Sequence, residues 1–123
     1  VPVYSSVYFK DSTKLFNLTA TLNIRNIDRN TDLYLQEINY YNSKGSLVKK
    51  FLTKTLKVKP LETFDIVIAE DDTSGGTGAS FIIKWVSKDK IQNPIIEAVM
   101  ISTRQGVGLS FITNGKVIKT ISR

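Results

Sequence analysis

Apolar and polar residues alternate strictly along residues 16–25, and this pattern constrains the fold more than any other part of the chain. The stretch reads "FNLTATLNIR", so every second residue from Phe16 to Ile24 is apolar and the residues between are polar. A period of two is typical of a strand with one buried face in an antiparallel sheet. The same period returns in "TFDIVIA", residues 63–69, which we also predict to be a strand.

The other candidate strands are rich in β-branched and aromatic residues and are separated by turn-forming residues. They cover residues 33–42, 46–58, 80–87, 94–103 and 108–121. Gly45 and Pro60 mark two of the breaks between them. No segment shows a convincing helical period. The chain is therefore predicted to be one all-β domain over residues 1–123, an antiparallel immunoglobulin-like β-sandwich of seven to nine strands.

Two late strands are apolar on both faces, which is not expected of a strand with one face in water. In "FIIKWV", residues 81–86, Ile82 and Val86 lie on the face opposite to Phe81 and Trp85. The stretch "PIIEAVMI", residues 94–101, also carries apolar residues on both faces. We therefore expect the outer face to be covered, either by the terminal segments or by another subunit.

Composition excludes several classes of function. The chain has no Cys and no His, which removes disulfides, thiolate nucleophiles, zinc-finger spacings and Ser-His-Asp triads. No catalytic residue, cofactor or metal is predicted, and no apolar run is long enough for a transmembrane helix. The net charge of +6 is spread over 17 Lys and Arg without a run of three. This pattern is typical of a basic surface, and no nucleic-acid partner is expected.

The stretch "EDDTSGGTGAS", residues 70–80, is the strongest candidate site. It lacks the G-x-x-x-x-G-K-[ST] pattern of a phosphate-binding loop. Its acidic and hydroxyl residues could supply calcium ligands, although the spacing of a calcium loop is absent. The alternative is a long connection between two strands, ordered and with glycines that its backbone path requires. The residues predicted here as a candidate binding loop are Ser74, Gly75, Gly76, Thr77 and Gly78.

Glu97 is the second candidate, because it shares a strand face with Ile95, Val99 and Ile101. If that face points inward, the buried carboxylate needs a partner, for which strand phase suggests Arg25 or Lys84. Otherwise Glu97 faces water. An enzyme would need Glu97 to share a cleft with an acidic residue of the glycine-rich stretch, in order to act as an acid–base pair. The acidic residues in question are Glu70, Asp71 and Asp72.

Basic residues follow one another along the predicted strand pair that includes residues 46–58. Lysine beside exposed aromatic residues can bind single-stranded nucleic acid. Lysine also protects the edge strands of a sheet from pairing with other chains, and we favour this interpretation. The residues concerned are Lys49, Lys50, Lys54, Lys57 and Lys59, with Tyr34, Tyr40 and Tyr41.

Several motifs together resemble, in order, an uncharacterised bacterial family of small exported proteins, a domain of unknown function. They are "VPVYSSVY", "FNLTATLNIRN", "SGG-G-ASFIIKW", "PIIEAVMI" and "GLSF" with a following Gly-Lys, and they span nearly the whole chain. The resemblance implies an exported protein, periplasmic or membrane-anchored, whose precursor carries a signal and could carry a lipid anchor. It assigns no catalytic residue. The stretch "LNIRNIDRNTDLYLQEINYY" is also similar to immunoglobulin-like and desiccation-related β-sandwich domains.

These observations together predict a non-catalytic envelope domain that binds a protein or ligand partner, or that scaffolds an assembly. The expected partner is another envelope protein or a second copy of the chain. The alternative is a carboxylate-dependent hydrolase or lyase acting on an anionic or glycan substrate. A third reading has the basic surface holding acidic polysaccharide, lipid or nucleic acid.

Overall fold

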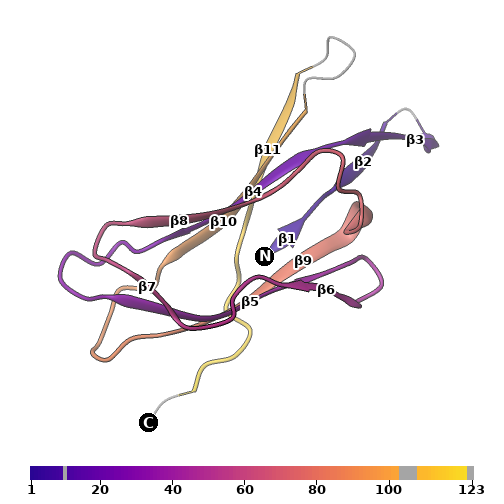
Figure 1. Ribbon diagram of the computed structural model, residues 1–123. Coiled ribbons are helices and arrows are strands. Elements are labelled where there is room, and N and C mark those ends of the chain that lie inside the picture. Colours follow the sequence, from indigo (N-terminus) through magenta and orange to yellow (C-terminus); the bar gives the residue numbers. More distant parts are fainter. Residues whose placement is uncertain (10, 103–107, 122–123) are drawn as a thin grey trace.

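The computed structural model describes residues 1–9, 11–102 and 108–121, which contain eleven β-strands, one short 3₁₀ helix and no α-helix (Figure 1). The all-β prediction is confirmed, but the strands exceed the seven to nine expected. No helix in these ranges is long and apolar enough to cross a membrane. The elements are β1 Pro2–Val3, β2 Ser6–Phe9, β3 Asp11–Asn17, β4 Thr19–Arg25, β5 Leu33–Tyr41, β6 Leu47–Lys50, β7 Leu56–Val58, β8 Thr63–Ile68, η1 Gly76–Gly78, β9 Ala79–Val86, β10 Ile95–Ser102 and β11 Leu109–Asn114.

The strands form two larger sheets and a hairpin, and all their pairings are antiparallel, as predicted. The first sheet has the order β1-β9-β5-β6, with β7 also paired to β5. The second has the order β11-β10-β4-β8, and β2 and β3 form the hairpin. Figure 1 shows the two larger sheets as two layers, with the hairpin projecting at one end.

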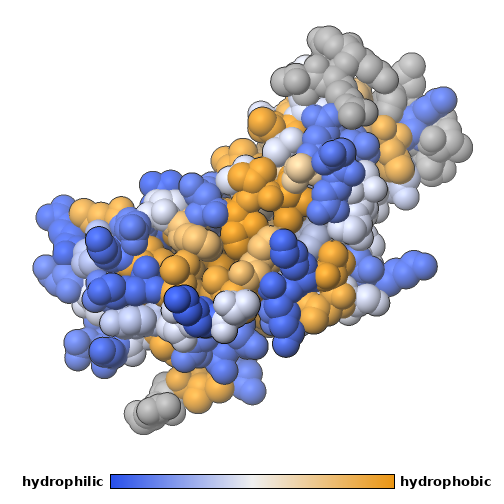
Figure 2. Space-filling model, in the orientation of Figure 1, coloured by the Kyte–Doolittle hydropathy of each residue, from blue (hydrophilic) through white to orange (hydrophobic). Residues whose placement is uncertain are grey.

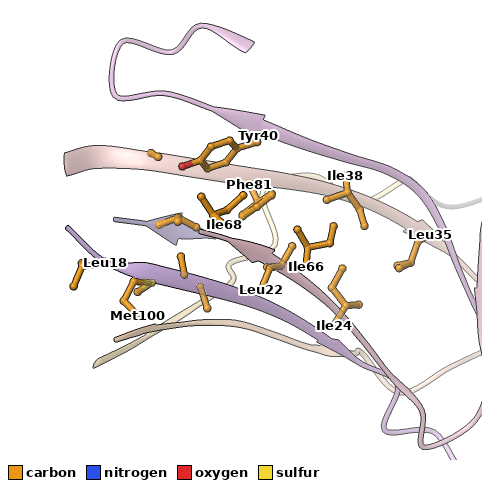
Figure 3. Close-up of a cluster of buried hydrophobic side chains, with 14 of the residues drawn as sticks. Leu18, Leu22, Ile24, Leu35, Ile38, Tyr40, Ile66, Ile68, Phe81 and Met100 are labelled. Carbon is orange, nitrogen blue, oxygen red and sulfur yellow. The ribbon is translucent and has the colours of Figure 1, made fainter. Parts of the chain in front are cut away.

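The core fills the space between the two layers. In β4 the alternate residues Ala20, Leu22 and Ile24 are buried, which confirms the buried face that the sequence pattern predicts. Figure 3 shows Leu22 and Ile24 pointing toward side chains of the first sheet, such as Ile38 and Phe81. Each fully buried side chain of this size contributes about 1.5–3 kcal/mol, so apolar burial between the layers is the main source of stability.

The predicted strand at residues 16–25 is two strands, with a break at Leu18. β3 ends at Asn17 and pairs with β2, whereas β4 begins at Thr19 and lies between β10 and β8. Leu18 itself is fully buried, and its N–H donates to the Ser5 carbonyl at 2.9 Å. The chain therefore changes sheets without losing its alternation. Periodicity reports which face is buried, but it does not report which strand lies alongside.

A buried asparagine holds the two layers together at the end of β4. The Asn26 side chain is fully buried, and its Nδ2 donates to the carbonyls of Thr31 at 2.9 Å, Val58 at 3.1 Å and Lys59 at 3.2 Å. Its Oδ1 accepts the N–H of Asp28 at 3.0 Å. Because Val58 belongs to the first sheet and Asn26 follows a strand of the second, this one side chain joins the two layers.

The Asp28 carboxylate is a group through which we expect pH to affect stability. Its carboxylate accepts hydrogen bonds from the N–H groups of Asn30 at 2.8 Å, Thr31 at 2.9 Å and Gln92 at 3.0 Å. These hydrogen bonds lower the pKa of Asp28 below its usual 3.8, and the bond from Asn30 has the largest effect. A carboxylate with a lowered folded-state pKa stabilises the fold above its unfolded pKa, and this stabilisation is lost as the pH falls through the folded pKa.

We therefore expect Asp28→Asn to lose less stability than the wild type when the pH falls from about 6 to about 2.5. Urea unfolding followed by circular dichroism at several pH values measures this difference. Asp71→Asn, which changes an exposed carboxylate in another loop, is the matched control. Equal pH dependence of the wild type and Asp28→Asn would contradict the prediction.

Candidate functional site

The glycine-rich stretch is an ordered loop between β8 and β9 whose backbone path requires glycine. Gly76 has a φ of +77°, the left-handed region that other residues adopt at a cost. Gly75 is buried, and a Cβ there would lie 1.9 Å from the hydroxyl oxygen of Tyr40. The expectation of a loop that depends on glycine is confirmed for Gly75 and Gly76, whereas Gly78 has neither a positive φ nor a close contact.

Contacts within the protein hold this loop in place. The Gly75 carbonyl accepts from both the N–H and the hydroxyl of Ser43, each at 3.0 Å, and the Gly78 N–H donates to the Ser43 hydroxyl at 2.8 Å. The Gly76 carbonyl accepts from the Ser5 N–H at 2.9 Å. Several of the loop's polar backbone groups are therefore used internally, and a binding role for it stays a prediction.

The rest of the loop is more open. Ser74 is exposed and bonds to the carboxylate of Asp72 through its N–H at 3.1 Å and its hydroxyl at 2.5 Å. Thr77 is half-buried in η1. Within the described ranges, no three acidic side chains gather in a way that could hold a metal ion. The geometry therefore gives the calcium alternative no support.

Tyr40 lies beneath the loop and has a structural role. It is buried, its hydroxyl lies 3.0 Å from the Ser5 Oγ, and its ring centroid lies 4.8 Å from that of Phe81. Burial raises the pKa of Tyr40, the Ser5 hydrogen bond opposes that rise, and the Asp72 carboxylate adds to it. Tyr40 is therefore not an exposed residue on which a base could stack. The prediction that groups it with Tyr34 and Tyr41 as an exposed aromatic residue is wrong.

The lysines of the predicted basic strand pair are exposed, and three of them lie on edge strands. Lys49 and Lys50 belong to β6, which ends the first sheet, and Lys57 belongs to β7, which pairs with β5 alone. Lys54 and Lys59 are exposed in the flanking segments. The position of Lys49, Lys50 and Lys57 on short edge strands matches the interpretation that these lysines discourage pairing with other chains.

Glu97 lies on the outward face of the second sheet. Its neighbours Ala98 and Met100 are fully buried, so Glu97 shares the opposite face with Ile95 and Ile101, which are 44% and 47% exposed. It is half-buried, with Asn23 and Asn114 opposite it on the adjacent strands. The alternative in which the Glu97 side chain points into the core is therefore wrong.

Neither suggested partner lies opposite Glu97. Arg25 lies across from Ile95, two positions along the strand, and Lys84 belongs to the other sheet, across from Glu37. Residues 70–72 lie beyond the far end of β8, whose Ile68 is opposite Ala20, whereas Glu97 is opposite Asn23. Three strand residues span about 10 Å. The structure thus does not bring Glu97 and these acidic residues together.

A different feature, the open edge of β9, was not identified from the sequence. β5 lies along one side of β9, but β1 accompanies only its first residues, with Pro2 opposite Ser80. Val1 and Phe81 exchange two backbone hydrogen bonds, at 2.8 and 2.9 Å. Beyond them no strand in the described ranges pairs with β9 on this side. Because backbone groups alternate in an antiparallel ladder, Ile83 and Trp85 direct theirs to the open side.

A groove of about 1660 Å³ runs along this open edge. One wall is β9, the other is the segment 115–121 that follows β11, and Ile96 of β10 also lines it. Figure 1 shows that segment passing from the second sheet toward the first. It carries Val117, Ile118 and Ile121, which are 60%, 75% and 74% exposed. Figure 2 shows apolar residues reaching the surface in the middle of the view, between the two layers.

The groove combines apolar and basic side chains. Ile83, Trp85 and Ile96 pack partly buried against the core and supply its apolar lining. Among the described residues that line it are no Asp and no Glu. Its charged side chains are Lys84, Lys88, Lys116 and Lys119.

The sequence feature that could have indicated this groove is the presence of apolar residues on both faces of residues 81–86. The expected cover by the terminal segments is incomplete, because Ile82 and Val86 are 43% and 39% exposed. Residues 108–121 were predicted as one strand, but β11 ends at Asn114. The segment that follows forms a groove wall instead.

Comparison with known proteins identifies a family. No curated protein and no solved structure matches the chain. A family model described as protein of unknown function (DUF3124) matches residues 1–118, a range that includes all the strands and most of the groove-lining residues. The chain therefore belongs to the DUF3124 family.

Proposed function

We propose that this protein is a non-catalytic binding domain whose partner is a polypeptide that docks in the groove beside β9. The observation that carries the proposal is the groove itself, which combines apolar residues of β9 with the side chains of Lys84, Lys88, Lys116 and Lys119. An extended peptide that adds a strand to a sheet gains affinity from main-chain hydrogen bonds and specificity from the pockets for alternate side chains. The groove offers apolar and basic side chains for such contacts.

We further propose an immunoglobulin-like β-sandwich as the fold and the bacterial envelope as the location, exported and periplasmic or membrane-anchored. Two antiparallel sheets around a common core support the first. The motif resemblance described above supports the second. The partner would then be another envelope protein or a second copy of the chain.

The hydrolase or lyase alternative has less support. It requires Glu97 and one of the acidic residues 70–72 to open onto one cleft, with carboxyl groups within about 10 Å. Glu97 lies on the outer face of the second sheet, and the acidic stretch follows the far end of β8. A binding domain is therefore the better proposal.

Selection from a phage-displayed library of random peptides tests the binding function. We expect enriched peptides to bind the wild type and to fail with Ile83→Pro. Proline at this position removes the outward N–H of an edge strand without breaking the ladder to β5. Circular dichroism and a thermal melt establish that the variant folds, and Val67→Pro on the edge strand of the second sheet is a distant control. The absence of enrichment, or binding that Ile83→Pro leaves intact, would contradict the proposal.

A further inference from the structure

We infer that one edge of the first sheet binds the surface of an anionic lipid bilayer and that Leu61 inserts into that surface. This edge, residues 44–61, runs from the turn before β6 through β7 to the turn before β8, and we call it the basic edge. β6 and β7 both pair with β5 on the side opposite to β9, so the basic edge and the groove are separate surfaces (Figure 1). The inference therefore goes beyond the proposed function.

The basic edge accounts for the whole net charge of the protein. It contains six lysines and no Asp or Glu, whereas the other 11 Lys and Arg of the chain are balanced by its 11 Asp and Glu. The six lysines, all exposed, are Lys44, Lys49, Lys50, Lys54, Lys57 and Lys59. Protection of edge strands explains those within β6 and β7, but Lys44, Lys54 and Lys59 lie outside these strands. The edge follows the nine residues of β5, so the charges are spread over about 25–30 Å and complement an extended anionic surface.

Leu61 has a backbone conformation that leucine adopts at a cost. Its φ is +64°, and it is the only residue other than glycine with a positive φ in the described ranges. It follows Pro60, and the Glu62 N–H donates to the Lys59 carbonyl at 3.0 Å, which is the pattern of a type II turn. Glycine or asparagine is usual at this position of such a turn. The turn therefore does not explain the leucine.

Packing does not explain Leu61 either. Its side chain is 65% exposed, and it belongs neither to the core nor to the apolar residues that pack against the core. Backbone strain of this kind is concentrated at functional sites. At the other end of the basic edge, Leu47 and Val48 are also exposed, by 46% and 39%. The basic edge thus presents apolar side chains to the outside at both of its ends.

The turn that carries Leu61 is attached to the core by hydrogen bonds. The Lys59 N–H donates to the Glu62 carboxylate at 2.9 Å, and the Glu62 carbonyl accepts the Asn26 N–H at 3.0 Å. The buried Asn26 side chain also donates to the Lys59 carbonyl at 3.2 Å. Because the turn is already ordered, little conformational entropy is lost when Leu61 inserts.

A bilayer fits this combination of side chains better than a charged polymer in water. Lysines near a membrane are attracted to anionic headgroups, and an exposed aliphatic side chain gains free energy at the boundary with the acyl chains. An acidic polysaccharide would meet the lysines but would offer Leu61 no acyl chain. A nucleic acid would need exposed aromatic rings for stacking. In this region Tyr40 is buried, and the Phe51 ring packs against Phe81 with the Lys49 Nζ 4.6 Å from its centroid.

Co-sedimentation with lipid vesicles tests the inference. We expect the protein to bind vesicles of mixed phosphatidylglycerol and phosphatidylcholine but not of phosphatidylcholine alone, and we expect added salt to weaken the binding. Lys54→Gln combined with Lys59→Gln should weaken binding about tenfold. Lys14→Gln combined with Lys116→Gln removes the same charge from exposed positions elsewhere and should change binding by less than about twofold. An equal loss in the two double variants would refute the role of the basic edge.

Leu61→Gly separates binding from folding. Glycine relieves the strained backbone, so we expect the melting temperature to rise by about 2–4 °C while the affinity for phosphatidylglycerol vesicles falls about threefold or more. Ile118→Asn, at a position that is 75% exposed outside the basic edge, is the control and should change neither quantity.

The remaining outcomes contradict the inference in distinct ways. A lower melting temperature for Leu61→Gly would show that the leucine serves the fold, and unchanged vesicle affinity would refute insertion. Retention on heparin without any binding to vesicles would assign the basic edge to an acidic polysaccharide instead. None of these results affects the peptide selection that tests the groove, because the two surfaces lie on opposite sides of β5.

Discussion

Gly75→Ala is expected to lower the free energy of unfolding by about 3 kcal/mol, although the backbone at Gly75 is in an ordinary helical conformation. Its φ of −76° and ψ of −34° suit any residue. The cost comes from space, because the new Cβ would lie 1.9 Å from the Tyr40 hydroxyl oxygen and 2.7 Å from the Ser5 Oγ. Tyr40 is buried and packs against Phe81, so it cannot move aside without disturbing the core.

Gly78→Ala is the matched control for this prediction. Its Cβ would lie 3.6 Å from the Ser43 Oγ, an ordinary contact, so we expect a change within about 0.5 kcal/mol. Urea unfolding followed by circular dichroism measures both variants. If Gly75→Ala is as stable as Gly78→Ala, the close packing of the loop on Tyr40 is not present in solution.

Asn26→Leu is expected to be at least as damaging, with a loss of about 3–5 kcal/mol. Leucine has a similar volume but cannot donate to the carbonyls of Thr31, Val58 and Lys59. A buried polar group left without a partner costs about 1–3 kcal/mol. The substitution removes the hydrogen-bond donor of all three carbonyls at once. Because a domain of this size is stable by only about 5–15 kcal/mol, this loss is a large fraction of the total stability and should lower the melting temperature markedly.

Asn30→Leu provides the comparison, because it makes the same substitution at an exposed position of the same corner. We expect it to change stability by no more than about 0.5 kcal/mol. Thermal unfolding of the two variants side by side distinguishes the loss of the Asn26 hydrogen bonds from a general intolerance of leucine there. A melting temperature for Asn26→Leu close to that of the wild type would refute the assigned role.

Sequence reasoning succeeded where the outcome depends on which face of a strand is buried. The alternation at residues 16–25 correctly places Leu22 and Ile24 in the core. It could not reveal the break at Leu18, because Leu18 continues the buried series while its N–H bonds to a loop carbonyl. The identity of a strand's neighbours is set by the topology of the whole chain, and local periodicity contains no information about it.

At the candidate sites, too, local features could be predicted from the sequence and features set by distant parts of the chain could not. Gly75 and Gly76 were singled out correctly, since close packing and positive φ both favour glycine, whereas Gly78 shows neither feature. The orientation of Glu97 stayed open, because both faces of its strand are apolar and the pattern fits either. The groove beside β9 is formed by β9 and by residues 115–121, segments far apart in the chain, so no local pattern could reveal it.

The pairing of β1 with β9 and of β4 with β10 also determines when the chain can fold. Ile95 lies opposite Arg25, so most of the polypeptide intervenes between two adjacent strands at the centre of the second sheet. Closing loops of this length loses entropy before any contact compensates for it, and such topologies fold in milliseconds to seconds rather than microseconds. During synthesis, β4 cannot pair with β10 until β10 has left the ribosome. The nascent chain therefore stays without the closed second sheet until β10 has been made.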